Sequence, residues 1–377
     1  MPVKDKIVNW YIKNIFIPKV EIIDKPGFVI TKFTIKNQTT FLRELFVSEQ
    51  LFESIEKEII KIFGEKGKKV LYSAGKKFGY NYASMSNFPT INTVNKKEFL
   101  DFTYKLVRYI EGMFSTKTDY KVDLDNKMFE ISFDNYIICR NNGFGYIMGD
   151  GGISGIWAYA LEDKTIEGVQ LKCQGRDDNE CSFICGPEKN IQEKTSKYIS
   201  EQNINDLKYD EFYKKMNEIR PTKNSLNSLK NLIDIGFFHY KGGLLTYKNI
   251  RFFPVESNIF YFIEDEILKL ENGEAVLFKI SMDYGRRLRQ EYGKKDWEKF
   301  ISDYFPALGF GDIVVLDSTK PKIASIYYPW TIYSKNSKYI IFRGILSGII
   351  SDSKDQMIKI KNYKTEVQDY LTLTFSN

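Results

Sequence analysis

The side chains best suited to chemistry are the cysteines in and near a predicted β-hairpin at residues 167–185, EGVQLKCQGRDDNECSFIC. Cys173 and Cys181 are separated by a turn, so the hairpin can place them side by side, and Cys185 follows on the same face as Cys181. Zinc prefers tetrahedral thiolate or imidazole sites. Three thiolates, or four with Cys139, would suit it. The alternative is that these cysteines are small buried side chains in strands.

A glycine-rich segment at residues 143–155, GFGYIMGDGGISG, precedes a predicted helix. Backbone N–H groups at a helix N-terminus can bind phosphate. The segment lacks the Lys-Ser or Lys-Thr pair of a P-loop and does not fit the G-x-G-x-x-G pattern. We therefore expect these glycines to allow close helix packing or a tight turn. Alternatively, they open the mouth of a pocket, with Asp150 as its polar group.

The sequence shows no convincing catalytic set. His239 is the only histidine, and no nucleophile pattern lies near it. Carboxylate pairs such as Glu56 and Glu58 lie on a predicted helix, where we expect a solvent-exposed face and no acid–base role. We therefore predict that the protein is not an enzyme.

Basic side chains gather at residues 66–77 and again at Arg286, Arg287 and Arg289. Arg286 and Arg289 share a predicted helix face and could contact the phosphates of an anionic partner. Acidic residues are interspersed, and no helix-turn-helix or other base-reading pattern is present. The alternative is that these runs are solvated helix faces.

Composition indicates a folded chain in a reducing compartment. The 377 residues suit two domains, and a hydrophobic content of 43% can supply their cores. Lys and Arg number 55 against 49 Asp and Glu, a net charge of +6 that permits an anionic partner without requiring one. Four cysteines without a dense framework, no signal-peptide pattern and no stretch long enough to span a bilayer predict a cytoplasmic protein.

Hydrophobic periodicity predicts the elements that must position these residues. The predicted helices span residues 51–63, 69–83 and 96–114, and a shorter one ends near Leu161. The predicted strands span residues 120–124, 128–133 and 136–140, followed by the cysteine hairpin. The predicted fold class is α/β (α+β), with helices packed on an antiparallel sheet.

The second half of the chain repeats this pattern. FESIEKEII at 52–60 matches FYFIEDEIL at 260–268, and VLYSAGKKFG at 70–79 matches VLFKISMDYG at 276–285. GISGI at 152–156 matches ILSGI at 345–349, and VQLK at 169–172 matches IKIK at 358–361. Four blocks in the same order predict two tandem copies that can pack as an internal pseudo-dimer. The predicted units are residues 1–187, with an N-terminal extension, a polar, partly helical linker at 188–224, and a degenerate second copy at 225–377.

Together these features resemble the 4-vinyl-reductase domain family. The residues that carry the resemblance are Gly75, Gly79, Gly155, Cys173, Gly175, Cys181 and Phe183. The match covers residues 51–185 and, with fewer shared residues, 244–375. The resemblance implies the α/β fold that this family shares with TRAPP-complex subunits and with the sensor domains of some aromatic-responsive transcription activators. It also implies a module that binds small molecules or proteins, is usually dimeric and has no uniform enzyme activity.

Some members of that family hold zinc with the two hairpin cysteines, a Glu three residues before the first, and an upstream cysteine. Cys173 and Cys181 stand at the hairpin positions, but Gln170 stands at the Glu position. No thiol lies near Gly145, where the upstream cysteine belongs. Half of the ligand set is therefore missing, and Cys139 or Cys185 would have to replace it. Zinc is the only cofactor that we expect.

We predict a non-catalytic module that binds a hydrophobic small molecule in the first copy and acts through a protein partner. We place its pocket between the helices at residues 69–83 and 152–161. The predicted lining is Tyr72, Phe78, Tyr82, Phe144, Tyr146 and Trp157. The alternative is an interaction scaffold or accessory subunit of a larger complex, which nucleic acid could join through Arg286, Arg287 and Arg289.

Overall fold

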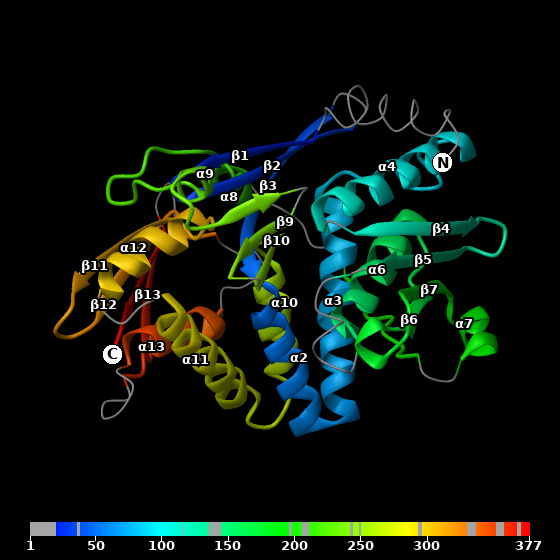
Figure 1. Cartoon of the computed structure of the whole chain (residues 1–377). Helices are drawn as coiled ribbons and strands as arrows, with labels where there is room; N and C mark the ends of the chain where they lie inside the picture. The colour runs from blue at the N-terminus through cyan, green and yellow to red at the C-terminus, as the bar shows by residue number, and fades with distance from the viewer. Residues whose placement is uncertain are drawn as a thin grey trace.

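The computed structural model describes residues 20–35, 38–114, 116–134, 136, 145–195, 198–205, 211–241, 244–248, 250–292, 296–329, 337–351, 358–367 and 371–377. This part of the chain is a mixed α/β structure in which helices pack on antiparallel sheets, as predicted (Figure 1). Within these ranges, none of the helices has the length and apolar character needed to cross a membrane.

The first half of the chain alternates groups of strands and helices. Its elements are β1 (Val20–Lys25), β2 (Phe28–Ile35), β3 (Gln38–Ser48), α2 (Glu49–Phe63), α3 (Glu65–Met85), α4 (Lys96–Phe114), β4 (Lys117–Asp123), β5 (Met128–Asp134), α6 (Ile147–Ala160), β6 (Ile166–Lys172) and β7 (Cys181–Pro187). Three short helices follow, namely α7 (Glu188–Lys194), α8 (Glu211–Met216) and α9 (Leu229–Asp234).

The elements of the second half come in the same order. They are β8 (His239–Lys241), β9 (Leu244–Tyr247), β10 (Ile250–Glu256), α10 (Ile259–Ile267), α11 (Gly273–Tyr292), α12 (Trp297–Ala307), β11 (Asp312–Asp317), β12 (Lys322–Ile326), α13 (Ile340–Ile350), β13 (Asn362–Val367) and β14 (Leu371–Ser376).

The predicted helices and most predicted strands are confirmed. The helix predicted at 96–114 has the bounds of α4, and α6 begins a little earlier than the predicted glycine helix. Of the strand predicted at 136–140, only Tyr136 lies within the described residues, and it is not in a strand.

Local sequence explains where α2 begins and ends. Ser48 is its N-cap and accepts a hydrogen bond from the Gln50 N–H at 3.2 Å. Leu51, Phe52 and Ile55 bury one face of the helix. At Gly64 the backbone has a positive φ of 57°, which glycine adopts without strain, and the chain turns into α3.

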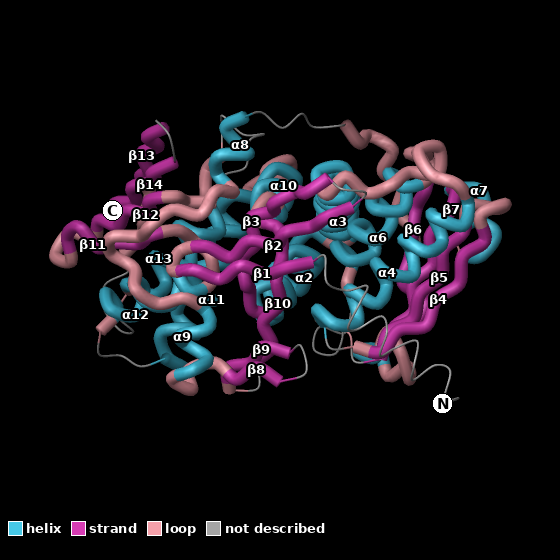
Figure 2. The backbone as a smooth tube through the Cα atoms, turned by 90° about the horizontal axis from the view of Figure 1, so that it is seen from above, coloured by secondary structure: helices cyan, strands magenta, loops and turns pink. Residues whose placement is uncertain are grey.

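Strands of both halves form one central sheet with the order β1-β2-β3-β10-β9-β8. The halves meet where β3 pairs antiparallel with β10, from Glu44 opposite Glu256 to Ser48 opposite Phe252. Each half also has its own four-stranded sheet, with the orders β4-β5-β7-β6 and β11-β12-β14-β13. Figure 2 shows these two sheets at opposite ends of the molecule with the central sheet between them.

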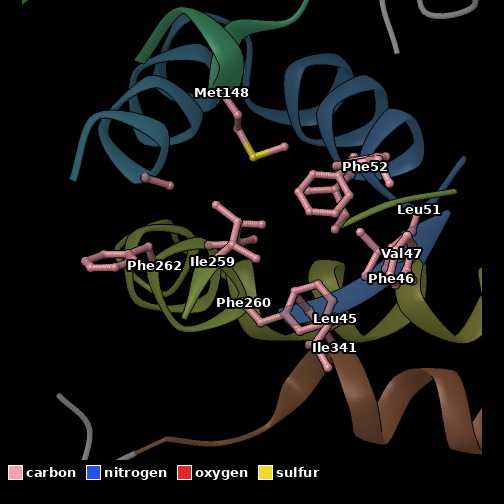
Figure 3. Packing of buried hydrophobic residues seen from close by; sticks show 14 of the residues in the cluster. Leu45, Phe46, Val47, Leu51, Phe52, Met148, Ile259, Phe260, Phe262 and Ile341 are labelled. Carbon is pink, nitrogen blue, oxygen red and sulfur yellow. The ribbon is translucent and has the colours of Figure 1, made fainter. Parts of the chain in front are cut away.

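The core beneath the central sheet is built from both halves. Figure 3 shows side chains of the two halves in one cluster, namely Leu45, Phe46, Val47, Leu51, Phe52, Met148, Ile259, Phe260, Phe262 and Ile341. Phe52 packs against Phe253 with ring centroids 5.4 Å apart and stacks on Phe260 at 6.3 Å. Burial of this apolar surface therefore holds the halves together.

Candidate functional site

Helices α3 and α6 pack directly against each other. A Cβ atom at Gly75 would lie 2.1 Å from the Met148 carbonyl oxygen, and one at Gly79 would lie 2.1 Å from that of Gly152. From the other helix, a Cβ at Gly155 would lie 2.1 Å from the Lys76 carbonyl oxygen. The prediction that glycines of residues 143–155 allow close helix packing is confirmed at Gly155. The predicted pocket between the two helices is wrong in its position, because their backbones already touch there.

A buried ionic cluster fixes α3 to β6. Lys76 Nζ lies 2.7 Å from Glu167 Oε2, and both side chains are fully buried. The Tyr72 hydroxyl donates to Glu167 Oε2 at 2.6 Å and accepts from the Gly168 N–H at 3.0 Å. Burial lowers the pKa of Lys76 and raises that of Glu167, while their attraction opposes both shifts. Tyr72, predicted to line a pocket, is therefore part of a closed internal network.

The other predicted lining residues are spread over several contacts. Phe78 packs on Tyr82 at 5.9 Å between ring centroids, and Tyr146 lies 6.0 Å from Tyr136. Phe144 lies outside the described residues. Trp157 stacks on Phe129 at 4.9 Å and, alone among the five described residues of that prediction, lines the cavity reported next.

An apolar cavity of about 50 Å³ lies on the side of α6 turned away from α3, between α4, β5 and α6. Its lining residues are Phe88, Phe99, Phe102, Thr103, Leu106, Val107, Ile110, Phe129, Ile131, Phe133, Ile153, Ile156, Trp157 and Ala160. The α4 residues follow the three- and four-residue spacing of one helix face, and the β5 residues alternate along one face of the strand. These periodicities were visible in the sequence, but they predict an apolar face without showing that it is hollow.

The cavity opens between α4 and α6. Phe102, Leu106 and Ile110 on α4 are only half-buried, as are Ile153 and Ile156 on α6. In contrast, the wall formed by β5 is buried. The half-buried side chains therefore mark the mouth, and the sheet forms the floor.

The hairpin cysteines lie in the hydrophobic core. Cys173, Cys181 and Cys185 are buried, and β7 places Cys181 opposite Phe133 and Cys185 opposite Phe129 of β5. Burial raises the pKa of the Cys185 thiol, whose Sγ lies 3.7 Å from the Phe129 carbonyl oxygen. Within the described residues, no group of three or more His, Cys, Asp or Glu side chains is arranged to hold a metal ion. Cys139 lies outside those residues, so the zinc set stays a prediction.

Glu56 corrects the expectation of a solvent-exposed face. Its side chain is fully buried, and Oε1 accepts a hydrogen bond from the Met148 N–H at the start of α6 at 2.8 Å. Burial raises the pKa of Glu56 to about 8. Glu264, at the same position of the matched block, accepts from the Ile341 N–H at the start of α13 at 2.9 Å. Each carboxylate thus satisfies a backbone donor at a helix start.

Asp150 is likewise buried. Its Oδ2 accepts from the Gln170 N–H at 3.3 Å, and burial raises its pKa well above the ordinary value. Asp150 therefore does not stand at the mouth of a pocket.

The three predicted anion-binding arginines have partners within the chain. Arg286 lies 3.3 Å from Asp283, and Arg287 donates to the Ser54 hydroxyl at 2.7 Å. Arg289 donates to the Ile349 carbonyl oxygen at the end of α13 at 2.8 Å. These contacts favour a structural role, and an anionic partner stays a prediction.

Comparisons with known proteins give no family. No protein-family model and no curated protein match the chain. Among solved structures, the chain is similar to the phenol-responsive sensory domain of the transcription activator PoxR with phenol, at 15% identity and a TM-score of 0.33. That match covers 48% of this chain and 90% of the other. A TM-score this low does not establish a common fold, and the resemblance to the 4-vinyl-reductase family stays a prediction.

Proposed function

We propose that the protein is a non-catalytic module that binds a hydrophobic small molecule in the cavity between α4, β5 and α6. The observation that carries this proposal is a hollow apolar space beneath a half-exposed rim. Small-molecule sites are concave and mostly apolar, whereas protein interiors are normally filled. The proposed role is therefore recognition, not chemistry.

The second half supports the proposal by contrast. Leu346 and Ile349 of α13 stand where Ile153 and Ile156 stand in the matched block of α6. Both are fully buried, whereas Ile153 and Ile156 are half-exposed at the rim of the cavity. The matched positions are thus covered on α13 in the second half, whereas on α6 in the first half they border a cavity.

Ligand entry requires the rim to move. An engineered apolar cavity of about 150 Å³ holds benzene, and this cavity measures about 50 Å³. Half-buried rim side chains such as Phe102 and Leu106 have solvent on one side and can turn outward. Binding would therefore expand the cavity at the α4 side.

Movement of α4 offers a route to a partner. Tyr109 of α4 packs edge-to-face on Phe33 of β2, with ring centroids 5.6 Å apart. β2 belongs to the central sheet that joins the halves. Under this proposal, ligand occupancy displaces α4 and changes the surface that a protein partner reads.

We also infer that the two halves are copies of one unit related by an internal pseudo-twofold axis. In support, their elements follow the same order and their four-stranded sheets have equivalent strand orders. The glycine contacts are equivalent as well, since a Cβ at Gly348 would lie 2.1 Å from the Met282 carbonyl oxygen, as at Gly155 and Lys76. This arrangement would give a monomer the geometry of a dimer.

Toluene-dependent thermal stabilisation tests the proposed site. Any ligand that binds only the folded state raises its stability by RT ln(1 + [L]/Kd). We expect toluene to raise the unfolding temperature of the native protein. Ala160→Leu, which fills the cavity, should remove that increase. Ala275→Leu on the exposed surface of α11 is the matched control and should keep it. The absence of any toluene effect on the native protein would contradict the proposal.

A further inference from the structure

Resting on the proposed function, we infer that the cavity selects small hydrocarbons and rejects hydroxylated analogues of the same shape. The chemical class of the ligand follows from the lining, whose surface toward the cavity is almost entirely carbon. Burying a hydroxyl group without a partner is unfavourable.

The polar side chains of the lining already have partners. Thr103 donates its hydroxyl hydrogen to the Phe99 carbonyl oxygen at 3.0 Å, within α4. Trp157 donates its indole N–H to the Lys127 carbonyl oxygen at 3.0 Å. The lining residues include no ionisable side chain, and the surface that they present to the cavity is almost entirely carbon.

The backbone around the cavity adds no free hydrogen-bonding group for a ligand. The lining residues other than Phe88 belong to α4, β5 and α6, where main-chain N–H and C=O groups pair within regular structure. Other hollows of the molecule differ in this respect, since one is lined by Glu264 and Ser257 and another by Lys121, Asp123 and Glu130. An uncharged ligand without donors therefore fits the α4–α6 cavity and no charged group does.

The walls favour a flat ring. Trp157 and Phe129 are stacked at 4.9 Å, Phe99 lies 5.7 Å from Trp157, and Phe88 meets Phe102 edge-on at 4.9 Å. Aromatic walls contact a ring through its face and its edge. The cavity measures about 50 Å³, and a cavity that holds benzene measures about 150 Å³, so even a single ring requires the expansion at α4 and a larger ligand would require more.

Toluene and phenol form the test pair, because they differ in a methyl and a hydroxyl group on the same ring. We expect calorimetric titration of the full chain to show toluene binding about tenfold to a hundredfold tighter than phenol, the factor that an unpaired buried hydroxyl typically gives. Equal or tighter binding of phenol would overturn the inference while leaving the proposed function intact.

Two variants complete the test. Ile153→Ala enlarges the cavity and should tighten toluene binding; if neither the native protein nor this variant binds either compound, the proposed function fails and the inference with it. Thr103→Val keeps the shape of the lining but removes its hydroxyl group. Because the surface that faces the cavity is almost entirely carbon, the Thr103 hydroxyl is not presented to a ligand, and the variant should leave the toluene-to-phenol ratio unchanged. A selective loss of phenol binding would show that Thr103 recognises a ligand hydroxyl and would overturn the inference.

Discussion

Two buried carboxylates face each other where the halves of the molecule meet. Glu44 of β3 lies opposite Glu256 of β10, and both are almost fully buried. The Ser257 N–H donates to the Arg43 carbonyl oxygen at 2.9 Å, which makes Glu44 and Glu256 a non-hydrogen-bonded pair, the closer type of cross-strand pair. Like charges directly opposite each other destabilise a sheet. One of the two carboxyl groups therefore has to be protonated or lie next to a positive charge.

Glu44 should make the protein less stable as the pH rises. Burial and then the charge of Glu256 raise its pKa to about 8 from an ordinary 4.5, and Thr31 lowers it only in part. The folded state therefore holds a proton that the unfolded chain releases. This contribution is complete below pH 4.5 and is lost as the pH rises to about 8. The free energy of unfolding should fall by about 1.4 kcal/mol per pH unit for this group.

Other groups near the pair do not reverse this sign. Tyr82 of α3 and Tyr109 of α4 face Glu44, and their pKa values are raised well above 10, so both stay neutral in this range. Glu56 and Glu264, with pKa values raised to about 8 and about 7, act in the same direction. Urea unfolding of Glu44→Gln from pH 5 to pH 8 should show a shallower fall than the native protein. Glu98→Gln, at an exposed site on α4, is the control, and parallel curves for Glu44→Gln and the native protein would refute the prediction.

The sequence predicts the burial of the cysteines better than the burial of the carboxylates. Burial of the thiols is one of the two alternatives that the sequence predicts, because cysteine is often a small core residue. A carboxylate on a helix predicts a solvent-exposed position, but Glu56 follows Phe52 by four residues and therefore lies on the apolar face of α2. The four-residue spacing from Phe52 therefore indicates that Glu56 is buried. The burial of Glu44 depends on pairing with a strand far along the chain, and no local pattern shows that.

At the scale of the elements, the contact between α3 and α6 leaves no space for a side chain at Gly75, Gly79 or Gly155. We expect Gly155→Ala to lower the free energy of unfolding by several kcal/mol, because the new methyl group would lie 2.1 Å from the Lys76 carbonyl oxygen and the helices would have to separate. Gly112→Ala is a matched control in α4, where a Cβ meets no atom within 4 Å. That change should stabilise the protein by about 0.5–1 kcal/mol through helix propensity. Chemical denaturation measures both, and equal effects would contradict the packing argument.

Periodicity predicted the elements but could not locate the cavity. Helices α2 and α4 show one apolar stripe each, so spacing predicts their buried faces. Helix α3 is buried on most of its sides, Lys76 included, which spacing does not predict. Helix α6, IMGDGGISGIWAYA, is apolar or small on most sides, so its sequence does not tell the face that packs on α3 from the face that lines a cavity. The glycines mark the first face. The second depends on how far α4 stands from the sheet, which is a tertiary property.

At the scale of the whole molecule, the central sheet carries the inferred symmetry. Phe46 and Pro254 each stand six residues before the matched residues Phe52 and Phe260, and they lie directly opposite each other in the β3–β10 pair. A twofold axis between antiparallel strands brings equivalent residues together in this way. The stacked rings of Phe52 and Phe260 are a second pair of equivalent residues in contact. The repeated blocks predicted the duplication, but not that the halves would share a sheet.

A shared sheet and core predict that the two halves unfold together. Phe52→Ala and Phe260→Ala should each lower the free energy of unfolding of the entire chain by about 3–5 kcal/mol, since each removes a buried ring. Because the rings touch, the double variant should lose less than the sum of the two, by about 0.5–1.5 kcal/mol. Guanidinium unfolding followed by far-ultraviolet circular dichroism and by tryptophan fluorescence should give one coincident transition. Two separate transitions, each shifted by only one of the variants, would mean that the halves are independent units and that a ligand-driven movement of α4 could not reach the second half through the sheet.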